Sequence, residues 1–300
     1  MQLMTFANVV RARLGVALSV SQVFTNPTIS AIAAVLDGDS DTASQLRAPV
    51  IAFRTGGTDT PVVLLPPGTG LGWRYGQLLA HIPERRAVYA IQSPQISDVA
   101  VDGAVSRAVD YFADQVHAAV PDGPVVLAGW SFGGSLAPAV AAELAARNRQ
   151  VESLVLLDAF AQSPAEYFAY IDSTSPHAAA VGALDVVVPD ELRSELTREQ
   201  AIELVLAGDS VFSGLDPEIV AAVLDSSAWS LRVMRDLTTP TNAVSIPVAY
   251  LEAEPAGSLA TWADTITPSA HLSVPWVHSA ILSPDAVAVW GPWLAEFLQE

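Results

Sequence analysis

The sequence contains no cysteine, and all 14 of its basic residues are arginine, so lysine is also absent. Without cysteine the chain has no disulfide framework, no zinc finger, no iron–sulfur site and no thiolate nucleophile. Without lysine it can form neither a Schiff base nor a complete phosphate-binding loop of the GxxxxGK[ST] type. If this chain makes a covalent intermediate, we therefore expect the nucleophile to be a hydroxyl or a carboxylate.

Basic residues are also few, because 14 arginines stand against 32 acidic residues for a formal net charge of −18. This balance argues against a nucleic-acid surface and against an electrostatic membrane anchor, which both need clustered bases. No apolar run approaches the roughly 18 residues of a membrane-spanning helix, and no signal-peptide pattern opens the chain. We expect a folded cytoplasmic protein, since 51% of its residues are hydrophobic.

Composition divides the chain into three regions. Residues 1–37 show two helical patterns joined by a loop, and residues 38–48 form an acidic stretch with the composition of a linker. From residue 49 to residue 300, apolar strands alternate with helical patterns, which predicts an α/β fold with a mostly parallel, doubly wound sheet. The predicted strands are Val50–Arg54, Pro61–Leu65, Val88–Gln92, Val125–Gly129, Leu154–Asp158, Val248–Glu252 and Leu272–Pro275.

One segment interrupts this alternation. Residues 162–238 contain only helical patterns, among them Asp190–Ala207 and Asp216–Asp225. An all-helical insertion of this size between two strands predicts a lid over the sheet.

The strongest motif is Gly-Trp-Ser-Phe-Gly at residues 129–133, which follows an apolar strand and opens a helix. This strand–turn–helix setting predicts the nucleophile elbow of an α/β-hydrolase, with Ser131 as the nucleophile. We expect Ser131 to have a positive φ, because the turn is tight, and Gly129 and Gly133 to lie where a Cβ would strike backbone. The amide of Phe132 is then expected to face the developing oxyanion.

A serine nucleophile needs a base, and the expected chain order in this fold is serine, acid, histidine. Only His271 and His278, of five histidines, come late enough and near the end of a strand. His271 begins its strand, whereas His278 follows it. Because catalytic groups gather at the carboxyl ends of parallel strands, we predict His278 as the base.

Three carboxylates end suitable strands. Asp158 ends the strand that follows the elbow helix, and Glu252 and Glu254 end the next strand along the chain. Spacing favours Asp158 and leaves the other two open.

The second oxyanion donor is expected in the loop after an early strand. Pro66 and Pro67 have no backbone N–H, so the candidates are the amides of Gly68 and Thr69.

These segments resemble the C-terminal (type I) thioesterase domains of non-ribosomal peptide synthetases. The similarity lies in PPGTGLGWRYGQLL at residues 66–79, in GPVVLAGWSFGGSLAPAVAAELAARNRQVESLVLLDAF at 123–160 and in the histidine before ILSP at 281–284. The resemblance implies Ser131, Asp158 and His278 as the triad and oxyanion amides at Phe132 and Gly68. It implies no metal and no cofactor on this domain, which is expected to be monomeric.

The first 37 residues resemble the last two helices of a peptidyl carrier domain, most clearly in VFTNPTISAIAAVL at residues 23–36. The family's phosphopantetheine-bearing serine would fall just before Met1, so we expect the phosphopantetheine to arrive on the upstream carrier domain. The implied activity transfers a peptidyl group from a carrier-bound thioester to Ser131 and releases that group by hydrolysis or macrocyclisation. The alternatives are a stand-alone serine esterase or editing (type II) thioesterase, and a non-catalytic hydrolase-like docking domain.

Overall fold

The structure of the chain is a computed structural model that describes residues 6, 9, 10, 13–15, 32, 33, 48–97, 99–162, 165–184, 186–208, 217–238 and 244–299. The predicted carrier helices and acidic linker lie almost wholly outside the described residues. In the described part, no helix is long and apolar enough to cross a membrane.

A seven-stranded sheet forms the centre of the molecule, with the strand order β1-β3-β2-β4-β5-β6-β7. All neighbouring pairs are parallel except the edge strand β1, which runs antiparallel to β3. The strands are β1 Val50–Arg54, β2 Asp59–Leu65, β3 Arg86–Ile91, β4 Val125–Trp130, β5 Val151–Leu157, β6 Val248–Glu254 and β7 Ala270–Val277. All seven predicted strands are therefore present, with boundaries shifted by up to three residues, and β4 is the central one.

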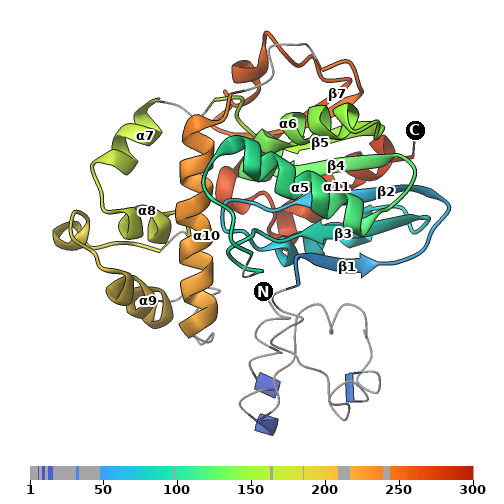
Figure 1. The fold of residues 1–300 in the computed structure, drawn as a ribbon. Helices are drawn as coiled ribbons and strands as arrows, with labels where there is room; N and C mark the ends of the chain where they lie inside the picture. The colour runs from blue at the N-terminus through green and yellow to red at the C-terminus, as the bar shows by residue number, and fades with distance from the viewer. Residues whose placement is uncertain are drawn as a thin grey trace.

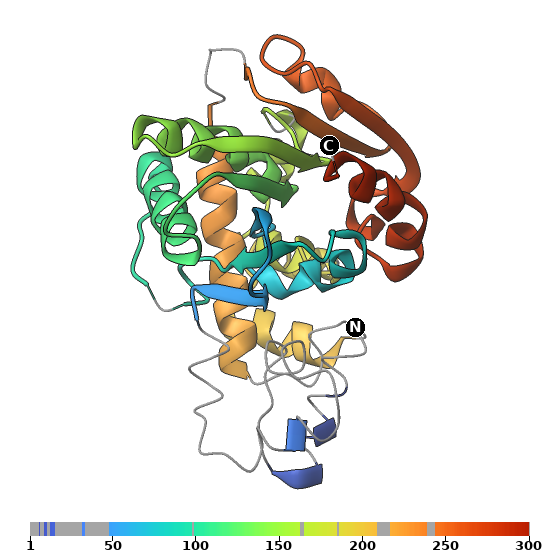
Figure 2. The same cartoon turned by 90° about the vertical axis from the view of Figure 1, so that its right-hand side faces the viewer.

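Helices cover both faces of the sheet, as Figure 2 shows from the side. On one face lie α5 (Val105–Ala119) and α6 (Phe132–Ala146), and on the other lie the 3₁₀ segment η1 (Gly72–His81) and α11 (Pro284–Phe297). Alternate residues of each strand point to opposite faces, so Val63 and Leu65 join the first core while Val62 and Leu64 join the second. The sheet is buried on both sides, which explains its near-continuous apolar strands.

The segment between β5 and β6 is helical, as predicted, and stands to one side of the sheet (Figure 1). It contains α7 (Ala165–Asp172), α8 (Pro176–Gly182), the 3₁₀ turn η2 (Asp190–Leu192), α9 (Arg198–Ala207) and α10 (Pro217–Asp236).

Two helix predictions in this segment were wrong in their extent. The predicted helix Asp190–Ala207 is broken, because Thr197 caps a new helix: its hydroxyl accepts from the amide of Gln200, whose side chain accepts in return from the amide of Thr197. The predicted helix Asp216–Asp225 is the first half of α10, which continues to Asp236.

The longer α10 joins the lid to the sheet domain. Its Trp229 packs against Phe112 of α5 and Phe132 of α6, with ring centroids 6.2 and 6.0 Å apart. Trp229 and Val233 belong to the same buried cluster as the strands and helices of that face. One helix therefore contributes both to the lid and to the main hydrophobic core.

Candidate active site

Ser131 lies between β4 and α6, in the backbone conformation expected of a nucleophile elbow. Its φ is 55° and its ψ is −122°, a conformation that non-glycine residues rarely adopt. Its amide donates a hydrogen bond to the carbonyl of Leu157 on the adjacent strand, at 3.0 Å. The predicted positive φ is confirmed, and the neighbouring strand helps to hold this strained residue in place.

The two glycines of the motif are required by close backbone contacts. A Cβ on Gly129 would lie 2.3 Å from the carbonyl carbon of Gly133, and a Cβ on Gly133 would lie 2.4 Å from the carbonyl oxygen of Leu65. Real Cβ atoms do not approach backbone so closely. The expected collision at both positions is confirmed, and the second contact shows that the elbow lies directly against the end of β2.

Asp158 and His278 form a direct pair, although 120 positions separate them in the chain. The Nδ1 atom of His278 lies 2.7 Å from Oδ2 of Asp158. Asp158 follows β5 and is only 4% exposed, while His278 follows β7, with β6 between the two strands. The strand order thus brings both side chains to the carboxyl edge of the sheet, where Ser131 also lies.

The other oxygen of Asp158 is also occupied. Oδ1 accepts from the hydroxyl of Ser258 at 2.6 Å and from the amide of Ala253 at 3.1 Å. Burial alone would raise the pKa of this carboxyl, but the hydrogen bonds from His278, Ser258 and Ala253 outweigh burial and hold its pKa below the ordinary value. Asp158 is therefore an ionised, fixed acceptor, and it too has a positive φ, of 44°.

The alternative acid Glu252 points to a different histidine. Its Oε1 accepts from the amides of Gly257 and Leu259, and its Oε2 lies 3.6 Å from Nε2 of His271. Glu254, the third candidate, is exposed. The structure brings Asp158, and neither glutamate, to His278.

Four of the candidate residues line a cavity of about 210 Å³. Ser131 and His278 both line it, and so do Gly68 and Thr69 of the loop after β2. A Cβ on Gly68 would lie 4.0 Å from Cβ of Phe132, so the two oxyanion candidates are neighbours. Phe132 is the first residue of α6, where backbone amides have no carbonyl partner within the helix.

Tyr75, which the sequence analysis did not single out, joins the elbow to the end of β2, just before the loop of residues 66–70 (the oxyanion loop) that contains the oxyanion candidates Gly68 and Thr69. Its hydroxyl donates to the carbonyl of Leu65 at 2.6 Å and accepts from the amide of Trp130 at 2.9 Å. Burial raises the pKa of Tyr75, so the phenol stays protonated and can donate. A tyrosine inside a 3₁₀ segment gives no local signal of this role, because both partners lie on distant strands.

An aromatic ring lies beside the histidine, and a cationic side chain lies over that ring. The ring of Trp130 lies 5.3 Å from that of His278, and the guanidinium of Arg74 lies 5.1 Å from the Trp130 ring centre. Arg74 and Trp130 both line the cavity. The lid closes the other side, with residues from α7, α8 and α10.

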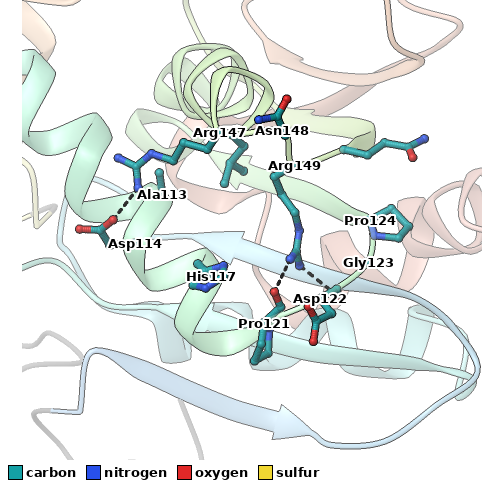
Figure 3. A pocket seen from close by; sticks show the side chains of 12 residues that line it. Ala113, Asp114, His117, Pro121, Asp122, Gly123, Pro124, Arg147, Asn148 and Arg149 are labelled. Atoms are coloured by element: carbon teal, nitrogen blue, oxygen red, sulfur yellow. Dashed lines mark hydrogen bonds and ion pairs between the residues drawn. The ribbon is translucent and has the colours of Figure 1, made fainter.

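A larger cavity of about 740 Å³ lies at the other end of β4 (Figure 3). Gly123 and Pro124, which precede β4, line it together with the C-terminal part of α6 and the residues that follow that helix. Arg147 there pairs with the carboxylates of Asp110, Asp114 and Glu143. Among the residues that the structure describes, no group of three potential metal ligands is found at either cavity or elsewhere.

Two families of known domains match the sequence. Residues 60–291 match the thioesterase domain family, and residues 1–36 match the family described as the phosphopantetheine attachment site. The first match covers the lid, all the candidate catalytic residues and the sheet apart from β1 and the first residue of β2.

The curated relatives are much larger proteins, and this chain matches only a part of each. A dimodular nonribosomal peptide synthase of Bacillus subtilis is 29% identical over 231 residues, which is 75% of this chain and 9% of that protein. CymA of Salinispora arenicola, described as a probable non-canonical nonribosomal peptide synthetase, is 28% identical over 298 residues, or 95% of this chain and 4% of that protein. The chain thus spans less than a tenth of the length of these two relatives.

Solved structures share the fold at low sequence identity. The Vlm2 thioesterase domain bound to a dodecadepsipeptide is similar with a TM-score of 0.63 at 18% identity, over 84% of this chain and 97% of that one. The thioesterase domain that cyclises the lipopeptide surfactin has a TM-score of 0.55 at 19% identity, over 88% and 99%. These similarities confirm the predicted α/β-hydrolase fold.

Proposed function

We propose, from the premise that the chain belongs to the thioesterase domain family, that it terminates peptide synthesis on a carrier protein. It takes a peptidyl group from the phosphopantetheine thioester of an upstream peptidyl carrier domain, forms an ester on Ser131 and then releases the chain. Relatives described as nonribosomal peptide synthetases support the peptidyl substrate. The match of residues 1–36 to the phosphopantetheine attachment family supports the carrier partner.

In the first half-reaction, Ser131 Oγ attacks the thioester carbonyl while His278 Nε2 takes the hydroxyl proton. Asp158, bound to Nδ1, holds the imidazole in the tautomer that leaves Nε2 free to accept, and stabilises the cation that forms. The amides of Phe132 and Gly68 bind the tetrahedral oxyanion. His278 returns the proton to the leaving thiol, the C–S bond breaks, and an acyl ester remains on Ser131.

In the second half-reaction, water or an internal amine or hydroxyl attacks the ester, and His278 again serves as the base. Attack by water gives a linear acid, and attack by an internal nucleophile gives a macrocycle. In either case Ser131 recovers its proton from His278 as the C–O bond of the ester breaks.

The same proposal divides the chain into three parts. Residues 1–37 belong to the carrier domain, residues 38–48 are a linker, and residues 49–300 are the catalytic domain with its lid at about 162–238, which acts as a monomer. The phosphopantetheine enters on the carrier domain rather than binding this chain as a resident cofactor.

One observation carries the catalytic proposal: the hydrogen bond from His278 to the buried Asp158, at the sheet edge where Ser131 has its strained backbone. The experiment is to offer a peptidyl thioester, on a carrier protein or as a small thiol ester, beside a simple aryl ester. We expect faster reaction of the carrier-linked thioester, with a linear or cyclic product that mass spectrometry separates by one water. Faster aryl ester turnover would favour a stand-alone esterase, and no labelling by a fluorophosphonate would favour a non-catalytic domain.

A further inference from the structure

Helix α10 carries three buried serines beside the candidate active site. Ser226, Ser227 and Ser230 are each 1% exposed or less. None of their hydroxyls has a hydrogen-bond partner in the part of the chain that the structure describes. This is unusual, because buried hydroxyls are nearly always paired, and a serine within a helix can bond to the carbonyl four residues before it.

Two of the three serines face the catalytic cavity. Ser227 and Ser230 line it together with Ser131 and His278, whereas Ser226 does not. Ser226 instead packs on the oxyanion loop, where a Cβ on Gly70 would lie 2.0 Å from its Oγ. The helix thus offers two cavity-lining serines and, one residue away, a buried serine with a different environment.

The oxyanion loop contributes a third hydroxyl to the same cavity. Thr69 lines it, is 5% exposed, and its Oγ1 is also buried without a partner among the described residues. Residues with unpaired hydroxyls therefore line the cavity on its lid side and on its loop side. A ligand that supplied only methylene groups would leave these hydroxyls unpaired, whereas a ligand with polar groups could pair them.

A secondary amide suits this lining, because each serine hydroxyl can both accept from an N–H and donate to a carbonyl. The cavity volume of about 210 Å³ lies below the range of about 300–1,000 Å³ for pockets that enclose a whole drug-sized ligand. Because Ser131 lines this small cavity, the part of the acyl chain next to the thioester is the part that meets it, and the amide in question is the one nearest to the reacting carbonyl.

We infer that Ser227 and Ser230 are specificity-determining residues that bind the first amide of the acyl chain and so select aminoacyl over plain fatty acyl thioesters. This inference rests on the proposed function, since it concerns the acyl group that Ser131 accepts. The competing occupant is a buried water molecule, which polar cavities of this kind also hold.

The test uses two N-acetylcysteamine thioesters of equal length, N-acetylalanyl and 2-methylpentanoyl, in which two carbons replace the amide. Release of thiol gives kcat/KM for both substrates with the full chain. We expect the wild type to prefer the N-acetylalanyl thioester and the double variant Ser227→Ala, Ser230→Ala to lose about tenfold or more of that preference. The preference is a ratio within one protein, so a general loss of folded enzyme does not change it.

Ser226→Ala is the matched control, because it removes a buried, unpaired hydroxyl from the same helix turn but not from the cavity lining. We expect it to keep the wild-type preference. An unchanged preference in the double variant would overturn the inference and assign the hydroxyls to water. If the wild type forms no acyl-enzyme with either thioester, the proposed function itself fails; if it turns over both equally well, only the inference fails.

Discussion

The two ends of the central strand β4 differ in backbone strain and in how many buried polar groups lack a hydrogen-bond partner. At its carboxyl end lies a cavity of about 210 Å³, with a strained serine and several hydroxyls that have no partner among the described residues. At its amino end lies a cavity of about 740 Å³, whose guanidinium groups are bound to neighbours apart from Nε of Arg149, which has no partner among the described residues. Arg147 pairs with three carboxylates, and Arg149 donates to the carbonyls of Val120 and Pro121.

This difference shows that the size of a cavity is a poor guide to its chemistry. Groups that already neutralise one another have little left to offer a ligand, and their contribution is to hold helices and turns together. Backbone strain and unpaired buried groups cost stability and persist where the surrounding structure supports them, often at functional sites.

Asp158→Asn should lower kcat by about 10,000-fold, because an asparagine amide favours the wrong imidazole tautomer and cannot stabilise the cation. The matched control is Glu252→Gln on the adjacent strand, which keeps an acceptor for its two backbone amides and should retain nearly wild-type kcat. Steady-state kinetics on one thioester measures both variants. A larger loss in Glu252→Gln than in Asp158→Asn would contradict the assignment of the acid.

Substitution of a glycine should cost more stability and activity near the carboxyl end of β4 than near its amino end. Gly133→Ala places a Cβ 2.4 Å from a backbone carbonyl, so we expect a loss of about 3 kcal/mol or more in the free energy of unfolding, with loss of activity. Gly123, at the amino end, has a φ of 77° but open space around it. Gly123→Ala should cost only about 1–2 kcal/mol and leave kcat unchanged, as denaturant titration and kinetics would show.

Tyr75→Phe removes the hydroxyl that joins Leu65 to Trp130, and should cost about 1–3 kcal/mol because two buried backbone groups lose their partner. It should also lower kcat, because the elbow and the oxyanion loop are no longer tied together. Tyr111→Phe is the matched control: its hydroxyl donates to the carbonyl of Gln92 and also contacts Ser97, away from the elbow. Equal kcat in the two variants would mean that Tyr75 does not position the active site.

Arg147→Ala should have the smallest effect. It breaks exposed ion pairs, which typically contribute about 1 kcal/mol or less, and we expect no change in kcat. A clear loss of activity without a loss of stability would mean that the larger cavity takes part in the reaction.

The elbow was predictable because its signals are local. The glycines, the apolar strand and the following helix all lie within about twenty residues, and the confirmed φ of Ser131 follows from that spacing alone. The seven strands were predictable for the same reason, since each is a short apolar run between turn residues. The break before α9 was also signalled locally, by Thr197 and Gln200, but the helical pattern on both sides concealed it.

The remaining features depend on contacts between distant segments. Spacing left Asp158 and Glu252 open, and strand order alone would favour Glu252, whose strand β6 is the neighbour of β7. The contacts decide instead, because Asp158 reaches His278 while Glu252 accepts from two backbone amides. Ser258, which donates to Asp158, and Tyr75 have no sequence signal for these contacts. The sequence alone does not distinguish the serines of α10 from other polar helix residues. Their position at the cavity depends on how α10 packs, with Trp229 against Phe132.

Trapping of the acyl group would show directly whether Ser131 is the nucleophile. Because the chain has no lysine, trypsin cleaves only after arginine, and Ser131 falls in the peptide between Arg107 and Arg147. After brief incubation with a peptidyl thioester and acid quenching, mass spectrometry should find the acyl mass on that peptide, with fragmentation assigning it to Ser131 rather than Ser135. Ser131→Ala should carry none; the same acyl mass on the Ser131→Ala protein would contradict the account.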